Sequence, residues 1–176
     1  MKKFLSIATA LAMITVTAIS VSAAEVTPQT EENASTSFSY EYKFDPSYTV
    51  TIPSQVTLTT EGTSVEIKAE NVANLDGKKV SVTIAGTDYF RNQMVLQGES
   101  DKAAKPTLRY QFIMPDESVV ETTGGKDQVN GVELASFTED GSTTFTVKPV
   151  LNNPSTPKGV KYSGTMTYAV ALTDAE

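Results

Sequence analysis

The chain has 176 residues, of which 39% are hydrophobic, and its formal net charge at pH 7 is −7. It contains no cysteine and no histidine, which excludes disulfides, thiol nucleophiles, histidine bases and histidine metal ligands. Because an acidic chain is short of the cations that neutralise phosphates, we expect no nucleic-acid partner.

Residues 1–23 have the form of a secretory signal peptide. Lys2 and Lys3 precede an apolar segment that runs from Phe4 to about Ile19, and small residues lead to Ala23. This segment is short for a bilayer span, and a retained membrane anchor is the alternative. Cleavage after Ala23 removes two lysines and no acidic residue, so the net charge becomes −9 and 153 residues remain, the size of one domain.

The next stretch divides into a polar part and an aromatic part. Residues 24–36 are acidic and almost without large apolar groups, which predicts a flexible leader. Residues 37–44 alternate large aromatic with polar side chains, which predicts a strand with one aromatic face. The four aromatic residues are Phe38, Tyr40, Tyr42 and Phe44.

Three interpretations of this aromatic segment remain open. It is the first strand of its own domain, or a strand that adds to the sheet edge of a neighbouring copy, or an exposed face for ligand stacking. The location of the four rings distinguishes these interpretations: burial in the same molecule favours a self-contained domain, and exposure favours donation to a partner.

Apolar residues recur at every second position through most of the remaining chain. Residues 48–53 and 162–172 are the strongest examples, and we expect these two flanking strands to close one apolar core. Turn signals separate about eight such stretches, and the two-proline connection 151–159 is expected to cross between sheets. The pattern predicts one domain over residues 37–176, an all-β, antiparallel, two-sheet, immunoglobulin-like sandwich, with a closed β-barrel as the alternative.

The closing stretch also suggests a family. Residues 162–175 resemble the last strand of the WxL-type cell-surface domains of Gram-positive bacteria, and residues 48–53 resemble strands of secreted β-sandwich proteins of Firmicutes. The resemblance implies noncovalent attachment to the cell wall. The chain has no tryptophan, so both Trp-x-Leu signatures are absent, and Tyr168 lies roughly where one is expected.

Few other residues indicate a site. Adjacent carboxylates at 116–117 and 139–140 fall in predicted turns, where solvated charge is expected in place of an acid–base pair. No calcium-loop spacing or phosphate-binding glycine loop is found in the sequence. We therefore predict no catalytic, cofactor-binding or metal-binding residues and no cofactor. Tyr89 and Phe90 are candidates for stacking against a ligand.

These observations favour a secreted, non-catalytic structural or adhesive protein of the cell surface, which assembles through residues 37–44. Its partners would be copies of itself, other surface proteins, or glycans of the cell wall or a host. A binding module for carbohydrate or cell-wall polymer is the alternative, and a carboxylate-dependent hydrolase is a third hypothesis. Because the sequence ends without a sorting motif or apolar tail, we expect release or noncovalent retention at the surface, with no membrane span after signal cleavage.

Overall fold

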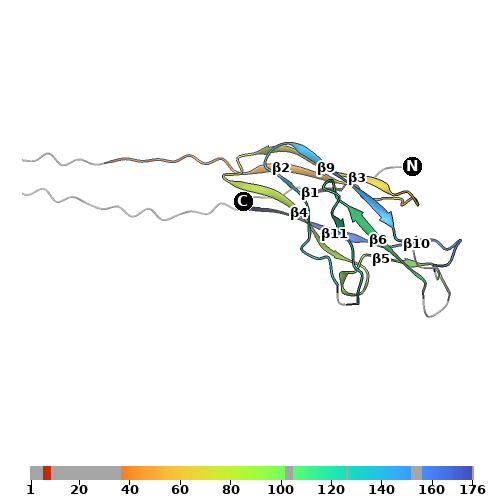
Figure 1. Cartoon of the computed structure of the whole chain (residues 1–176). Helices are drawn as coiled ribbons and strands as arrows, with labels where there is room; N and C mark the ends of the chain where they lie inside the picture. Colours follow the sequence, from red (N-terminus) through yellow and green to blue (C-terminus); the bar gives the residue numbers. More distant parts are fainter. Residues whose placement is uncertain (1–5, 9–36, 102–104, 126, 152–155, 176) are drawn as a thin grey trace, which may run out of the picture.

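The computed structural model describes residues 6–8, 37–101, 105–125, 127–151 and 156–175, and it shows an all-β protein (Figure 1). The predictions made for residues 9–36 lie outside the described residues. The strands are β1 (Ser6–Ala8), β2 (Ser47–Ile52), β3 (Thr63–Ala73), β4 (Lys78–Thr87), β5 (Val95–Gly98), β6 (Thr107–Ile113), β7 (Val119–Val120), β8 (Glu133–Phe137), β9 (Gly141–Pro149), β10 (Tyr162–Ser163) and β11 (Met166–Asp174). A 3-10 turn, η1 (Phe90–Asn92), lies between β4 and β5.

Two antiparallel sheets share one apolar core. The larger sheet has the order β1-β2-β3-β9-β6-β5-β10, with β7 paired to β6, and the smaller sheet has the order β11-β4-β8. The core takes Ile67 and Phe145 from the larger sheet and Val82 and Ile84 from the smaller one. The predicted two-sheet, all-β architecture is therefore confirmed.

Alternation of apolar and polar residues determines which face of each strand is buried. In β3, Val65, Ile67 and Ala69 are buried, whereas Glu66 and Lys68 between them are exposed. Successive side chains of a strand point to opposite faces, so this sequence can bury one face against the other sheet and leave its charges in water.

The turn between β3 and β4 carries the chain from the larger sheet to the smaller one. Asn74, Asp76 and Gly77 adopt positive φ values of 59°, 51° and 77°, a region that Asn, Asp and Gly tolerate better than other residues. The Lys78 N–H donates to the Leu75 carbonyl at 3.0 Å, and the Leu75 side chain is buried. This turn also supports the chain that precedes β2.

The last crossing between sheets occurs later than the sequence suggested. The two-proline connection 151–159 was expected to cross, but β10 still pairs with β5 in the larger sheet, and only β11 joins the smaller sheet. The chain therefore changes sheets at residues 164–165. A Cβ atom on Gly164 would lie 3.0 Å from Leu96 Cδ2, so the backbone passes close to β5 at a position suited to glycine.

No helix within the described part of the chain is long and apolar enough to cross a membrane.

Candidate assembly surface

The four aromatic residues of the leading segment are exposed. Their exposed fractions are 91% for Phe38, 86% for Tyr40, 66% for Tyr42 and 63% for Phe44. Residues 37–46 form no strand, although a strand was predicted over residues 37–44. The interpretation as a first strand packed on its own domain is therefore wrong, because its rings lie outside the apolar core.

The segment nevertheless keeps the two faces that its sequence predicts. The ring centroids of Tyr40 and Tyr42 are 6.4 Å apart, and those of Tyr42 and Phe44 are 4.8 Å apart with an edge-to-face angle of 88°. Glu41 and Lys43 alternate with these aromatic residues in the sequence, and Lys43 Nζ lies 3.4 Å from Glu41 Oε1. The aromatic rings thus lie together, and so do the charged groups, as in a strand that has one apolar face and no partner.

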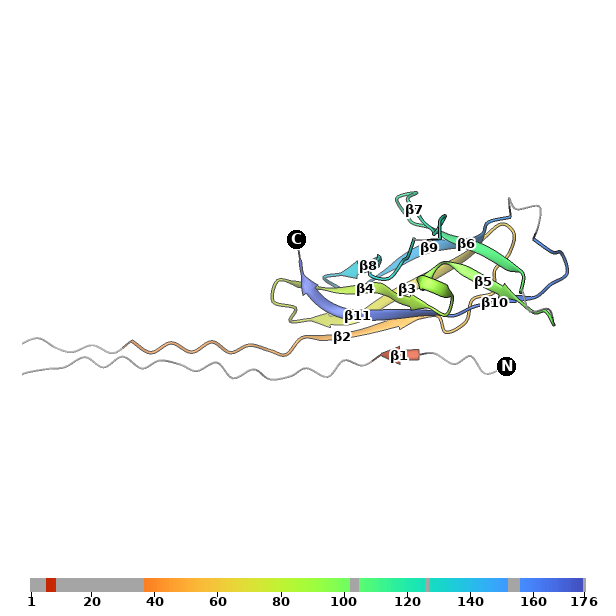
Figure 2. The ribbon, with the colours of Figure 1, turned by 90° about the horizontal axis from the view of Figure 1, so that it is seen from below.

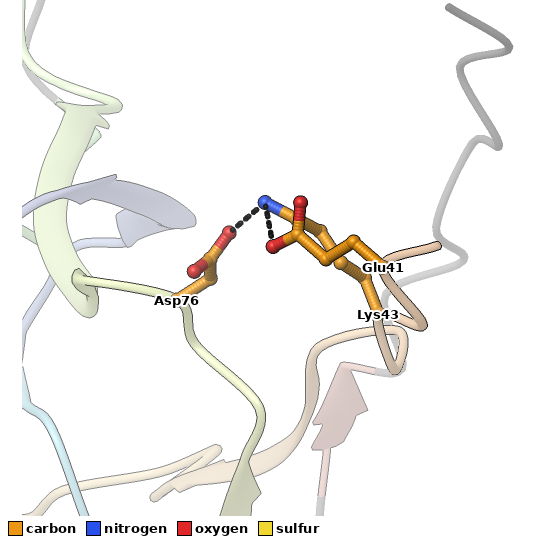
Figure 3. A network of polar contacts seen from close by, with 3 residues as sticks. All are labelled: Glu41, Lys43 and Asp76. Atoms are coloured by element: carbon orange, nitrogen blue, oxygen red, sulfur yellow. Dashed lines mark hydrogen bonds and ion pairs between the residues drawn. The ribbon is translucent and has the colours of Figure 1, made fainter. Parts of the chain in front are cut away.

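Polar contacts hold the base of this segment against the β3–β4 turn. Lys43 Nζ donates to Asp76 Oδ2 at 3.2 Å (Figure 3), and Asn74 Nδ2 donates to the Asp45 carbonyl at 3.4 Å. The hydrogen bond to Asp76 and the negative charges of Asp76 and Glu41 raise the pKa of Lys43 above its ordinary value. Because these groups are exposed, the contacts orient the segment and add little stability.

The segment leaves the domain at the start of β2 and points away from it. Figure 2 shows residues 37–46, in orange, extending from β2 beyond both sheets. The aromatic face is therefore presented at one end of the molecule, where another molecule can reach it.

The strand that follows, β2, has an edge that accepts an added strand. On one side, β2 pairs with β3, as in Val50 with Ala69. On the other side, β1 pairs antiparallel, with Ser6 opposite Ile52 and Ala8 opposite Val50. Residues 6–8 belong to the predicted signal peptide. Among the described residues, the strand that covers the outer edge of β2 is thus β1, a segment whose removal the sequence predicts.

The first half of β11 and the chain after β2 face a common cavity of about 650 Å³. Its lining includes Leu58, Val65, Tyr110, Phe112, Met166 and Tyr168. Burial raises the pKa of Tyr110, with smaller contributions from Tyr168 and Asp88, and burial also raises the pKa of Tyr168. The two hydroxyls therefore stay neutral, and the cavity lining combines apolar side chains such as Leu58 and Met166 with polar ones such as Thr59.

The face of β11 that points toward the core is partly exposed. Met166, Tyr168, Val170 and Leu172 alternate along β11, pack against the core and remain partly exposed. The inward residues of β4, its neighbour, are fully buried. The core is therefore less well covered along β11 than at the centre of the smaller sheet.

The structure separates the two candidate stacking residues. Phe90 is 67% exposed, whereas Tyr89 is half-buried. The Arg91 guanidinium carbon lies 5.1 Å from the centroid of the Phe90 ring, and Arg91 Nη1 donates to the Gly125 carbonyl at 3.0 Å. One face of the Phe90 ring already has a cation near it. The four exposed aromatic residues of the leading segment lie elsewhere in the chain, before β2.

The sequence predicted the aromatic face of residues 37–44, and Pro53 predicted a bend or an edge directly after residues 48–52, but the partly exposed face of β11 was not predicted. Alternation shows which side of a strand is apolar, but not which strands lie at an edge. Pro53 was a usable signal, because proline cannot donate to a ladder and is common beside sheet edges. Nothing comparable in the sequence marks β11.

Comparison with protein-family models, curated proteins and solved structures finds no match for this chain. Function has to be inferred from the residues and contacts themselves.

Proposed function

We propose that this protein is an exported, non-catalytic structural or adhesive subunit of the cell surface, and that residues 37–44 mediate its assembly. The exposed aromatic face of this segment is the observation that carries the proposal. We infer export from the predicted signal peptide, so the proposed location of the subunit is outside the cell or noncovalently held at its surface. The lack of histidine and cysteine motivates the non-catalytic assignment.

A contiguous aromatic surface in water favours association. Each aromatic side chain that becomes buried can remove about 150–250 Å² from water, so four of them can contribute roughly 600–1,000 Å². An area of this size approaches what one partner contributes to a specific protein interface. An extended peptide can also add backbone hydrogen bonds when it joins a sheet edge, and alternate side chains then enter pockets.

Sedimentation velocity of the chain that begins at Ala24 tests this proposal. Changing Phe38, Tyr40, Tyr42 and Phe44 together to serine should abolish oligomers, because it removes the apolar face and leaves the backbone intact. The matched control changes Ser37 and Ser39 to alanine, on the other face of the same segment, and should leave assembly unchanged. Oligomers of equal size in the aromatic variant would refute the proposal.

A second candidate function, binding of carbohydrate or cell-wall polymer, is favoured by the exposed Phe90 ring. Sugar rings stack on exposed aromatic faces, and Arg91 beside the ring supplies hydrogen-bond donors. A glycan array would detect such binding. Phe90→Ala should then abolish the signal, whereas Val119→Ala, at another exposed apolar residue, should not; an array without signal would dispose of this candidate.

A further inference from the structure

We propose that the outer edge of β2, together with the partly exposed side chains of β11, forms the acceptor for residues 37–44 of a second copy of this chain. This inference rests on the proposed function and specifies the docking site. The donor segment and its acceptor lie on different surfaces of one molecule, so each copy can give a strand to one neighbour and receive a strand from another.

The backbone of β2 supports this assignment. β1 pairs antiparallel with Val50, Thr51 and Ile52, which shows that this edge accommodates an added strand. Cleavage after Ala23, as the sequence predicts, would remove β1. The N–H and C=O groups on the outer side of β2 would then lack strand partners, and such an edge is a template for pairing with another chain.

The side chains around this edge suit an aromatic donor. Val50 is buried, and Tyr48 and Ile52 on the same face pack against the core. In an antiparallel pair, residues that lie opposite each other point to the same face. Donor residues opposite these three positions would therefore point inward, and a period of two would bring several aromatic rings to that face.

We expect these rings to cover the partly exposed side chains of β11 and the apolar part of the cavity lining. Figure 2 shows β1 on the outer side of β2. The chain directly after β2 shares the cavity of about 650 Å³ with Met166 and Tyr168 of β11. A strand added at the edge of β2 would thus have one end near this cavity, whose lining includes the partly exposed Met166 and Tyr168.

The donor cannot reach the edge of its own β2 through a tight hairpin. Only Asp45 and Pro46 separate Phe44 from Ser47, the first residue of β2. Two-residue hairpins need a positive φ at one or both central residues, with glycine at the first position of type II′, and proline is fixed near −65°. The contacts of Lys43 and Asp45 with the β3–β4 turn also direct the segment outward. The acceptor therefore belongs to a second copy.

Charge does not oppose this docking. The donor segment carries one acidic residue, Glu41, and one basic residue, Lys43, so it is neutral although the whole chain is acidic.

A contact between two different surfaces of identical molecules does not close on itself unless the rotation happens to form a ring. The expected product is a linear series of copies.

Engineered disulfides between copies test the site, because the chain has no cysteine of its own. Donor residues that point away from the core should lie opposite residues of β2 that also point away from it. Chains with Ser39→Cys or Glu41→Cys are therefore mixed, under mild oxidation, with chains that carry Thr49→Cys or Thr51→Cys. All chains begin at Ala24. The control acceptor is Thr144→Cys, on the exposed face of β9, which is paired on both sides within the sheet.

At least one donor–acceptor combination with β2 should give about tenfold more mixed dimer than the same donor with Thr144→Cys, because a disulfide needs Cβ atoms within about 4.5 Å. No excess at β2, in mixtures that still assemble through the aromatic segment, would overturn the acceptor and leave the proposed function standing. Loss of both assembly and cross-linking would overturn both. An undiminished cross-link after the four aromatic residues are changed to serine would overturn the docking of the rings. Urea unfolding of each cysteine variant verifies that it is folded.

Discussion

Thr122, in the loop after β7, satisfies a buried backbone group of a distant segment. The Met94 N–H donates to Thr122 Oγ1 at 2.9 Å, and both residues are buried. A buried donor that loses its acceptor costs about 1–3 kcal/mol. This hydroxyl therefore helps to fix the chain immediately before β5.

Thr122→Val should lower the free energy of unfolding by about 1–3 kcal/mol, because it keeps the shape of the side chain and removes the acceptor. Thr122→Ser keeps the hydroxyl group and should retain most of the stability. Urea denaturation followed by circular dichroism measures both. Equal losses in the two variants would show that the methyl group, and not the hydrogen bond, is responsible.

Glu133 on β8 accepts hydrogen bonds from two side chains of β4, Lys79 and Ser81. Ser81 Oγ donates to Glu133 Oε2 at 2.5 Å, and Lys79 Nζ donates to Glu133 Oε1 at 3.2 Å. Burial tends to raise the pKa of Glu133, but the hydrogen bonds from Ser81 and Lys79 and the charge of Lys79 outweigh it, so the pKa is lowered from 4.5. The folded state thus favours the carboxylate form.

Glu133→Gln should lower the free energy of unfolding at neutral pH by up to about 1 kcal/mol, a modest value because the group is partly exposed. A lowered pKa gives a contribution that is present above the unfolded value and lost as the pH falls through the folded value. The difference between wild type and variant should therefore shrink toward about pH 3. Urea titrations at both pH values measure it, with Glu139→Gln as an exposed control. A difference independent of pH would contradict this explanation.

At the level of elements, alternation predicted most of the strands but not their partners. The pattern around Val65, Ile67 and Ala69 correctly predicted both the strand and its buried face. The same pattern predicted a strand at residues 37–44, which form no strand in the part of the chain that the structure describes. Alternation shows which face of a strand is apolar, whereas pairing depends on residues far away in the sequence, so the strand partners and the crossings between sheets were not predictable. The late crossing at Gly164 is a further example.

Phe112 on β6 is a buried aromatic residue, and its removal should cost more stability than the removal of an exposed one. Its ring centroid lies 4.8 Å from that of Phe145 and 6.0 Å from that of Tyr110, and Phe112 is buried. Phe112→Ala should cost about 3–5 kcal/mol of stability, because it removes apolar contacts and leaves a cavity in the core. Phe38→Ala, at an exposed ring, should change the stability of the monomer by less than about 0.5 kcal/mol. Urea unfolding at a concentration where the protein is monomeric measures both, and similar losses would contradict the exposed placement of Phe38.

At the scale of the whole molecule, an acidic chain must associate against its own charge. The predicted mature chain has a net charge of −9, whereas the proposed donor segment is neutral. Repulsion between copies is therefore long-range, and the proposed attraction is short-range and apolar. Salt screens the first and does not weaken the second.

Raising the NaCl concentration from about 20 mM to about 300 mM should increase the assembled fraction, because the screening length falls to a few ångströms. Sedimentation velocity at fixed protein concentration measures this fraction. The variant with four serines in place of the aromatic residues should remain monomeric at both salt concentrations. Dissociation of the wild-type assembly by salt would instead indicate that ion pairs between copies hold it together.

Hydrogen–deuterium exchange of the backbone amides in residues 37–44, measured at increasing protein concentration, tests the central claim most directly. These amides have no strand partner among the residues that the structure describes, so they should exchange rapidly in dilute solution and become protected as copies associate. Rapid exchange at every concentration, or protection that does not depend on concentration, would contradict strand donation between copies.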